Sequence, residues 1–165
     1  MKQIVDPRTL IGTAIYLEDG RFYGTVGDIE LPDVSFGSVE TGTAMKREQV
    51  VPVLEAMKAR IKVHGDHKEL VAAAAKQITD STKVFIRNDM TTAKHDSVEI
   101  TLGGNVKVLK NPLPKTGEKA EAEIEINTDL YIFMVNGEKY YEIDAKNLVC
   151  MINGVDLMAE TRANL

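Results

Sequence analysis

A long alternating stretch that ends in Asn136-Gly137 constrains the fold of this chain more than any other part of the sequence. From residue 120 to residue 126, alanine and isoleucine alternate with three glutamates, and residues 130–135 are apolar. Alternation with a period of two is typical of a β-strand with one buried face. Asn-Gly favours the tight turn of a hairpin, so residues 138–144 are expected to form the returning strand. The sequence therefore predicts a long antiparallel hairpin.

Further strand signals lie elsewhere along the chain. Strands are expected at residues 11–17, 21–26, 28–31, 83–88, 97–102, 106–109 and 148–152. Tight turns at Asp19-Gly20 and at Gly103-Gly104 are each expected to join two of these strands into a hairpin. The C-terminal residues 155–165 are expected to be partly helical. Residues 1–165 are therefore predicted to form one mainly β domain without internal repeats.

Residues 53–63 fit two patterns. Apolar residues four positions apart, beginning at Val53, would suit a helix, but from Met57 to Val63 apolar residues alternate with three cations. Strict alternation over seven residues favours a strand, which we expect from Glu55 onward. The three cations are Lys58, Arg60 and Lys62. We interpret them as charges that aid solubility or protect a strand edge, rather than as a binding patch.

One helix is predicted near residues 67–77. Asp66 can accept hydrogen bonds at its start, and Glu69, three residues later, completes a capping box. The helix is short and only mildly amphipathic, so it is expected to need a sheet to dock on.

Residues 35–48 are expected to form a long loop. This segment contains Gly37, Gly42 and several serines and threonines, and it shows no clean periodicity. Long loops inside compact domains are usually functional or flexible.

Composition and charge restrict the class of protein. A net charge of -5 argues against a protein that wraps nucleic acid by neutralising phosphates. An acidic surface is compatible with DNA that slides past without binding. The single cysteine, Cys150, lies in an apolar run and is expected to be a small buried residue rather than a nucleophile. No apolar segment is long enough for a membrane span and no signal peptide is recognisable, so a soluble protein without a membrane anchor is expected.

No constellation of residues predicts catalysis or a cofactor. His64 and His67 lie three apart but are expected on opposite sides of a turn, so surface histidines are favoured over a metal pair. No phosphate-binding loop or nucleophile elbow is present. Glu121, Glu123 and Glu125 share one strand face, which we interpret as a solvated face rather than an acid–base pair. The chain is therefore expected to be no enzyme and to need no cofactor or metal.

The C-terminal third contains a distinctive succession of residues. The run 115–120 leads into a long strand that contains Tyr131, and it is followed by Asn136, Gly137, Ile143, Asp144, Asn153, Gly154, Val155, Asp156 and Arg162. This succession resembles the major tail tube proteins of contractile-tailed phages and the tube protein of R-type pyocins, most specifically from residue 115 to residue 162. Upstream, Asp19-Gly20, Leu31-Pro32 and Met45 also fall where such proteins carry similar residues.

This resemblance implies a mainly β (α+β) fold, an antiparallel β-sandwich or barrel-like tail tube subunit with one flanking α-helix. Six copies would form a ring whose strands join into one β-barrel, and rings would stack into the inner tube of a contractile tail. The loop 35–48 would contact neighbouring subunits. Its candidate residues are Phe36, Gly37, Gly42, Met45, Lys46 and Arg47.

The resemblance also implies the partners and location of the protein. Expected partners are other copies of the chain, the tail sheath protein, the tape measure protein, and baseplate and tail terminator proteins. DNA would pass through the lumen without sequence-specific binding. The location would be the virion tail, after assembly in the host cytoplasm. We expect Glu121, Glu123 and Glu125 to line the lumen or, alternatively, to face outward toward the sheath.

Three other functions fit the sequence less closely. The same tube could belong to an R-type bacteriocin, or to a type VI-like contractile injection system. A small β-barrel binding module is a rival from a different class, but it would need a pocket with converging polar groups. A binding module is expected to keep a fixed small size, whereas a tube protein is expected to polymerise with concentration or an initiator.

Overall fold

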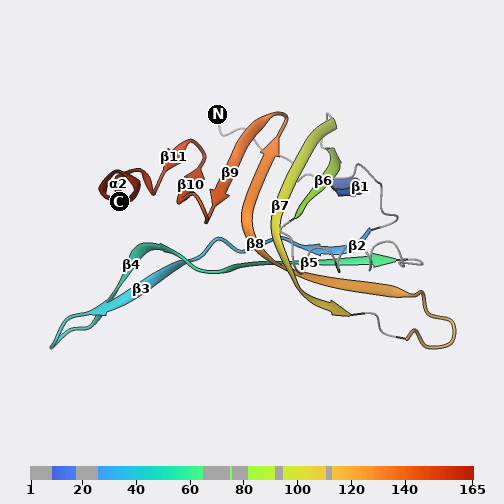
Figure 1. The fold of residues 1–165 in the computed structure, drawn as a ribbon, viewed down its shortest axis with the longest axis horizontal. Coiled ribbons are helices and arrows are strands. Elements are labelled where there is room, and N and C mark those ends of the chain that lie inside the picture. Colours follow the sequence, from blue (N-terminus) through green and yellow to red (C-terminus); the bar gives the residue numbers. More distant parts are fainter. Residues whose placement is uncertain (1–8, 18–25, 65–74, 76–81, 92–94, 111–112) are drawn as a thin grey trace, which may run out of the picture.

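The computed structural model describes residues 9–17, 26–64, 75, 82–91, 95–110 and 113–165. The described residues form eleven strands and a C-terminal helix (Figure 1). In chain order these are β1 (Thr9–Leu17), β2 (Val26–Glu30), β3 (Phe36–Thr41), β4 (Arg47–Leu54), β5 (Met57–His64), β6 (Thr82–Thr91), β7 (His95–Lys110), β8 (Glu121–Val135), β9 (Glu138–Asp144), β10 (Val149–Ile152), β11 (Val155–Asp156) and α2 (Ala159–Asn164).

Two long strands, β7 and β8, connect two layers of antiparallel sheet. The first half of β7 and the second half of β8 lie in a sheet of order β1-β6-β7-β8-β9-β10-β11. The other halves of the same two strands lie in a sheet of order β2-β5-β8-β7. Figure 1 shows the two layers crossing, with β7 and β8 curving from one to the other. We call the second, four-stranded layer the lower sheet.

The strand β7 bends between the layers at Gly103 and Gly104. A side chain on Gly104 would place its Cβ 1.9 Å from the Asn127 carbonyl oxygen, and a Cβ on Gly103 would lie 3.0 Å from Leu130 Cβ. The register between β7 and β8 shifts at this point. Glycine is typical of strand bends where another backbone approaches closely. The predicted turn at Gly103-Gly104 is therefore wrong: β7 is one continuous strand, and its glycines permit a bend rather than a reversal.

The hydrophobic core lies between the layers. Alternate residues of β5 and β8 point into it, so Ala59, Ile61, Ala122 and Ile126 are buried while their neighbours face outward. This confirms the strand prediction for residues 57–63 and the predicted faces of the long hairpin strand. Cys150 is fully buried among these residues, and burial, followed by the charge of Asp156, raises the pKa of its thiol.

The segment predicted as a long loop, residues 35–48, is mostly a β-hairpin. β3 and β4 pair over residues 36–54 around a turn at residues 42–46 and project from the body of the molecule (Figure 1). The prediction failed because both faces of the hairpin are largely exposed, so no alternation of buried residues marks it. Cross-strand backbone hydrogen bonds form the pairing without a core.

Several other predictions have mixed outcomes. The Asn136-Gly137 hairpin, the strand at residues 148–152 and the C-terminal helix are confirmed in essence. The first strand pairs with β6, while the returning strand expected at residues 21–26 lies, except for Val26, outside the described residues, so the N-terminal hairpin stays a prediction. Asp19-Gly20 lies outside the described residues, as does nearly all of the predicted helix at 67–77.

Candidate assembly surfaces

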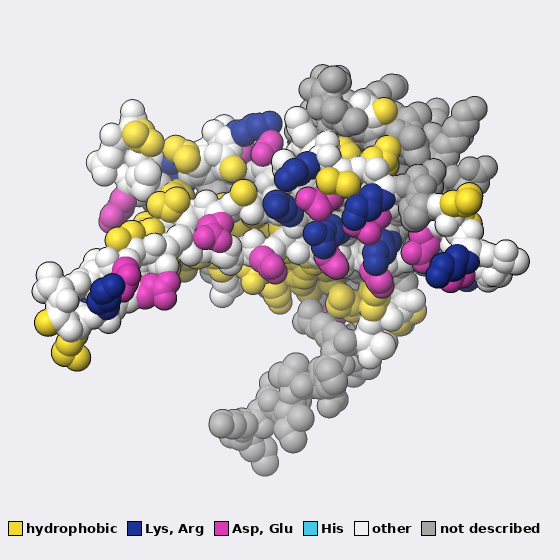
Figure 2. All heavy atoms as spheres, turned by 90° about the horizontal axis from the view of Figure 1, so that it is seen from below, with side chains coloured by type: hydrophobic (Ala, Val, Ile, Leu, Met, Phe, Trp, Pro, Cys, Tyr) yellow, Lys and Arg dark blue, Asp and Glu magenta, His cyan; other side chains and the backbone are white. Residues whose placement is uncertain are grey.

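The outward face of the lower sheet is covered by charged residues that alternate in sign from strand to strand. Figure 2 shows acidic and basic side chains intermingled on this face. Each strand carries one sign: acids on β2 and β8, cations on β5 and β7. The residues are Asp28 and Glu30, then Lys58, Arg60 and Lys62, then Glu121, Glu123 and Glu125, then Lys107 and Lys110. Among the residues that the structure describes, the face therefore holds as many carboxylates as cations.

The predicted acidic stripe on β8 is paired with cations on both sides. Arg60 Nε donates to Glu125 Oε2 at 3.2 Å, and Lys110 Nζ lies 3.6 Å from Glu123 Oε1. The hydrogen bond and charge of Glu125 raise the pKa of Arg60. His64 Nδ1 lies 3.2 Å from Glu121 Oε1, but without hydrogen-bond geometry. The three glutamates share a face as predicted, but that face is balanced in charge rather than acidic.

The cations of β5 do not protect a strand edge. β5 lies between β2 and β8, and Arg60 reaches a carboxylate on each neighbour, with Glu30 Oε2 3.5 Å from its Nη1. Cross-strand pairs of opposite charge stabilise a sheet modestly. The sequence shows the two stripes separately, but it does not show that the chain places them side by side.

Two strand edges of the lower sheet lack a partner within the described residues. β2 pairs with β5 on one side only, and residues 105–110 of β7 pair with β8 on one side only, because β6 begins at Thr82, opposite Gly104. An open edge presents unpaired backbone donors and acceptors, which can pair with another chain.

The β3–β4 hairpin separates the predicted loop residues into two groups. Phe36 and Gly37 lie at its base, where Phe36 packs against the core. At the tip, Gly42 adopts φ +114, which a side chain would strain, and a Cβ there would also lie 2.1 Å from the Met45 carbonyl oxygen.

The tip of the hairpin is exposed and partly apolar. Met45 is 88% exposed, and Val39 and Val50 are more than half exposed. Beside them, Lys46 pairs with Glu40 at 3.2 Å, and Arg47 Nε donates to Thr41 Oγ1 at 3.4 Å. Exposed apolar side chains on a projecting hairpin are typical of a contact surface.

The family-motif residues hold the turns and the C-terminus in place. Asn136 and Gly137 adopt positive φ in the hairpin turn, and Asn136 Nδ2 donates to Asp96 Oδ1 at 2.8 Å. Ile143 is fully buried, and Asp144 accepts hydrogen bonds from the turn at residues 145–148. Asn153 and Gly154 repeat the positive-φ turn between β10 and β11, where Val155 begins the last short strand.

Asp156 and Arg162 fasten the C-terminal helix. Asp156 Oδ2 accepts a hydrogen bond from Arg162 Nη2, and Arg162 Nη1 donates to the Leu148 carbonyl oxygen at 2.7 Å. Hydrogen bonds from Arg162 and from the Met158 backbone lower the pKa of Asp156. These residues therefore have a structural role within the subunit, and α2 is too short to be stable without such contacts.

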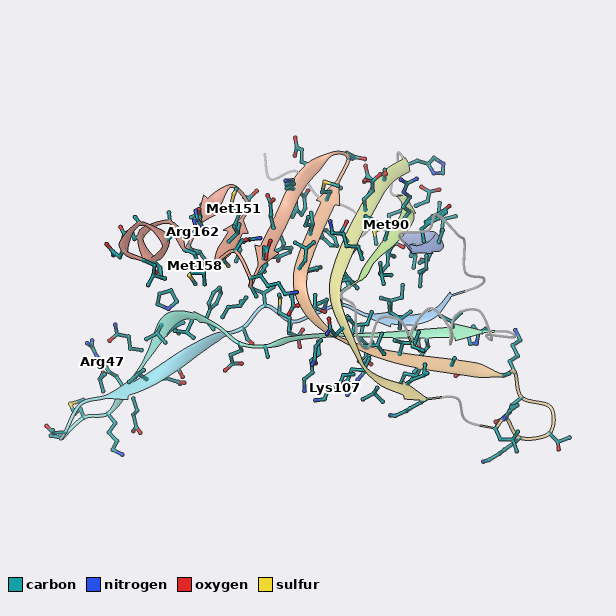
Figure 3. The ribbon with its side chains drawn as sticks, viewed as in Figure 1. Arg47, Met90, Lys107, Met151, Met158 and Arg162 are labelled. Atoms are coloured by element: carbon teal, nitrogen blue, oxygen red, sulfur yellow. The ribbon has the colours of Figure 1, made fainter. Side chains whose placement is uncertain are left out.

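A mainly apolar groove of about 660 Å³ lies between the base of β4 and the C-terminal segment. Its lining includes Pro52, Val53, Leu148 and Met158, and Figure 3 shows Met158 between α2 and β4. Among the described residues, no cluster of His, Cys, Asp and Glu could hold a metal ion, and no helix could cross a membrane. No sequence pattern marks this groove, because its walls come from segments that lie far apart in the chain, mainly residues 52–58 and 145–161.

Comparisons with known proteins agree with this architecture. The tail tube protein of Escherichia phage P2 is 28% identical over 74 residues, which cover 45% of this chain and 43% of that protein. The matched part therefore spans less than half of the length of that relative.

Three solved structures have a similar fold at low sequence identity. The sheath/tube terminator of the extracellular contractile injection system PVC matches with a TM-score of 0.58 at 10% identity, over 81% of this chain and 99% of that chain. A chain of the PVC sheath–tube complex matches with a TM-score of 0.54 at 12% identity, over 74% and 88%. The anti-feeding prophage cap, which terminates a tube, matches with a TM-score of 0.58 at 14% identity, over 80% and 93%.

The sequence profile of the phage tail tube protein FII family matches residues 7–165, which is nearly the whole chain. This protein therefore belongs to the phage tail tube protein FII family.

Proposed function

We propose that this protein is the subunit of the inner tube of a contractile phage tail, in which hexameric rings stack around a conduit for DNA ejection. Family membership supports the role as a tube component. The single observation that carries the geometry is the four-stranded lower sheet, whose two edges have no partner among the described residues. A head-to-tail contact that closes by rotation gives a ring, and stacked rings give a filament.

The outward face of the lower sheet lines the lumen in this proposal. Closing a barrel across subunits satisfies the open edges and leaves one sheet face toward the channel. That face carries Glu121, Glu123 and Glu125 together with their cationic partners, so DNA passes a wall of fixed, mutually paired charges. The absence of a net positive charge on the face disfavours phosphate binding.

The β3–β4 hairpin contacts a neighbouring subunit in this proposal. It projects from the body and carries exposed apolar side chains near Met45, while Gly42, Lys46 and Arg47 shape the tip. The remaining partners are the sheath, tape measure, baseplate and terminator proteins, and the location is the virion tail after assembly in the host cytoplasm. The role is structural and requires no catalysis or cofactor.

An R-type bacteriocin or another contractile injection system is the second candidate for the same tube. The fold shared with chains of the PVC particle supports it.

Negative-stain electron microscopy of the purified protein over a concentration series tests the proposal. Hollow tubes, or rings with sixfold symmetry seen end-on, are expected at high concentration or after addition of a lysate that contains baseplates. Small particles of uniform size under both conditions would contradict a tube function and favour a binding module.

A further inference from the structure

We infer that the β2 edge of one subunit pairs antiparallel with residues 105–110 of β7 in the next subunit, and that this seam is an ion-pair ladder. Asp28 and Glu30 of one copy then face Lys107 and Lys110 of the adjacent copy. This inference rests on the proposed ring and names the surfaces that close it.

The two edges have similar lengths, and neither is paired with another strand among the described residues. β2 has five residues and the free edge of β7 spans residues 105–110, so the two can pair along nearly their full lengths. Both edges belong to the same sheet and lie at opposite ends of its strand order, β2-β5-β8-β7. A second copy of the chain placed beside the first therefore continues the sheet in the order β7-β2 without rearrangement of either copy.

The direction of the strands follows from symmetry. Each neighbouring pair in the lower sheet is antiparallel, so β2 and β8 run one way and β5 and β7 run the other. Rotation about a ring axis keeps the direction of every strand along that axis. β2 of the next subunit therefore runs opposite to β7, and the seam has the same antiparallel pattern as the pairs within the subunit.

The charges on the two edges are opposite in sign. The outward face reads acid, base, acid, base from β2 to β7, so a β7–β2 seam continues the alternation around the ring. Figure 3 shows Lys107 directed away from the core, on the outward side of the lower sheet. Pairs of opposite charge on adjacent strands are favourable, whereas like charges directly opposite each other are unfavourable.

Asp28 and Lys107 have no ion-pair partner in the described part of their own subunit. Within the part of the chain that the structure describes, neither forms an ion pair, whereas Glu30 and Lys110 each have one at 3.5 Å and 3.6 Å. Both unpaired residues lie at an irregularity in the strand register, Asp28 between Val26 and Ile29 and Lys107 between Val106 and Val108. An adjacent copy supplies each with a partner.

Charge reversal on one edge at a time tests the seam. The first variant carries Asp28→Lys and Glu30→Lys, and the second carries Lys107→Glu and Lys110→Glu. Each variant alone has like charges at both edges, so the concentration at which tubes form should rise at least tenfold, and less so at high salt. Mixed in equal amounts, the two variants should form tubes again, because they can alternate around a ring with an even number of subunits.

A matched control is the variant with Lys58→Glu and Lys62→Glu, which reverses two cations on the same face in a strand that the seam does not involve. It should assemble as the wild type does. Thermal unfolding of each variant checks that it folds. If a variant does not fold, amide hydrogen exchange of the wild-type protein is measured instead, before and after assembly. Residues 27–30 and 105–110 should gain protection when tubes form.

The outcomes separate this inference from the proposed function. If the wild type forms tubes but both edge variants match the control, or if the mixture fails to assemble, the seam is refuted and the tube function stands. Unchanged exchange at both edges in assembled tubes would refute it equally. If the wild type forms no ring or tube under any condition, the proposed function itself is contradicted.

Discussion

At the scale of single residues, the polar side chains that carry the family resemblance position other parts of the subunit. Asp156 and Arg162 illustrate this, because their paired charges hold the C-terminal helix near β10 instead of facing a ligand. Asn136 acts similarly at the other end of the sheet, where it accepts from the Ser97 backbone N–H at 3.0 Å. The sequence identifies these residues through the family resemblance, but the partners that they hold could not be read from it.

The Asp156 carboxylate predicts a dependence of helix docking on pH. Its pKa is lowered in the folded state by the hydrogen bonds of Arg162 and Met158, so the stabilisation is present above the unfolded pKa and is lost as pH falls through the folded value. The protection of the α2 amides, measured relative to their intrinsic exchange rate at each pH, should therefore fall in acid. Asp156→Asn should show weak protection already at neutral pH and lose most of this dependence, whereas Glu160→Gln, on the same helix, should behave as the wild type. An unchanged pH profile in Asp156→Asn would contradict this role.

Cys150 should be inert to thiol reagents in the native subunit. It is 1% exposed, and burial raises the pKa of its thiol, so little reactive thiolate is accessible. Labelling with iodoacetamide near neutral pH should be at least about a hundredfold slower in the native protein than in urea-unfolded protein, which follows from the rarity of opening. Labelling at the unfolded rate would show that β10 does not pack as described.

At the scale of elements, prediction from sequence succeeds where one face of a strand is buried. Residues 57–63 and 120–126 alternate strictly because one face meets the core, and strands are found there at Met57–His64 and Glu121–Val135. The β3–β4 hairpin has no buried face, so its sequence wrongly predicts a loop. Gly103-Gly104 wrongly predicts a turn, because a sequence does not distinguish a reversal from a bend between two sheets.

The bend in β7 predicts a large cost for a side chain at Gly104. Gly104→Ala places a Cβ within 1.9 Å of a backbone oxygen, so the two long strands must separate. We expect a loss of at least about 2 kcal/mol in the free energy of unfolding, as is usual for strain at a special backbone position. Gly12→Ala is the control, because a Cβ at Gly12 would meet nothing within 4 Å. Equal urea midpoints for both variants would contradict the bend.

The β3–β4 hairpin tip predicts an assembly defect without a folding defect. Met45→Ser should leave the urea midpoint of the monomer unchanged, because Met45 is 88% exposed. If a neighbour buries this side chain, the assembly concentration should rise at least about tenfold, since burying a methionine is worth about 1.5–3 kcal/mol. Leu113→Ser removes a side chain that is equally exposed, at 94%, on a different segment. An assembly curve for Met45→Ser that matches the wild type would remove the hairpin tip from the interface.

At the scale of the whole molecule, the subunit is a two-layer β structure. Within the described residues, the lower sheet ends in two open edges of opposite charge, while its outward face is balanced by ion pairs among β2, β5, β8 and β7. The sequence supplied each charged stripe and the family resemblance, but the order of the strands across the sheet came only from the structure. Because β2 and β7 lie at opposite ends of that order, the lower sheet of one copy can pair with the lower sheet of the next copy.

The most direct test of the tube function is a helical reconstruction by cryo-electron microscopy of the assembled protein. The account predicts a hollow tube whose wall is a continuous β-barrel, with Glu121, Glu123 and Glu125 facing the lumen and the β3–β4 hairpin seated against a neighbouring subunit. A tube with the face of β1, β6 and β9 toward the lumen, or one in which the lower sheets of adjacent subunits do not touch, would contradict it.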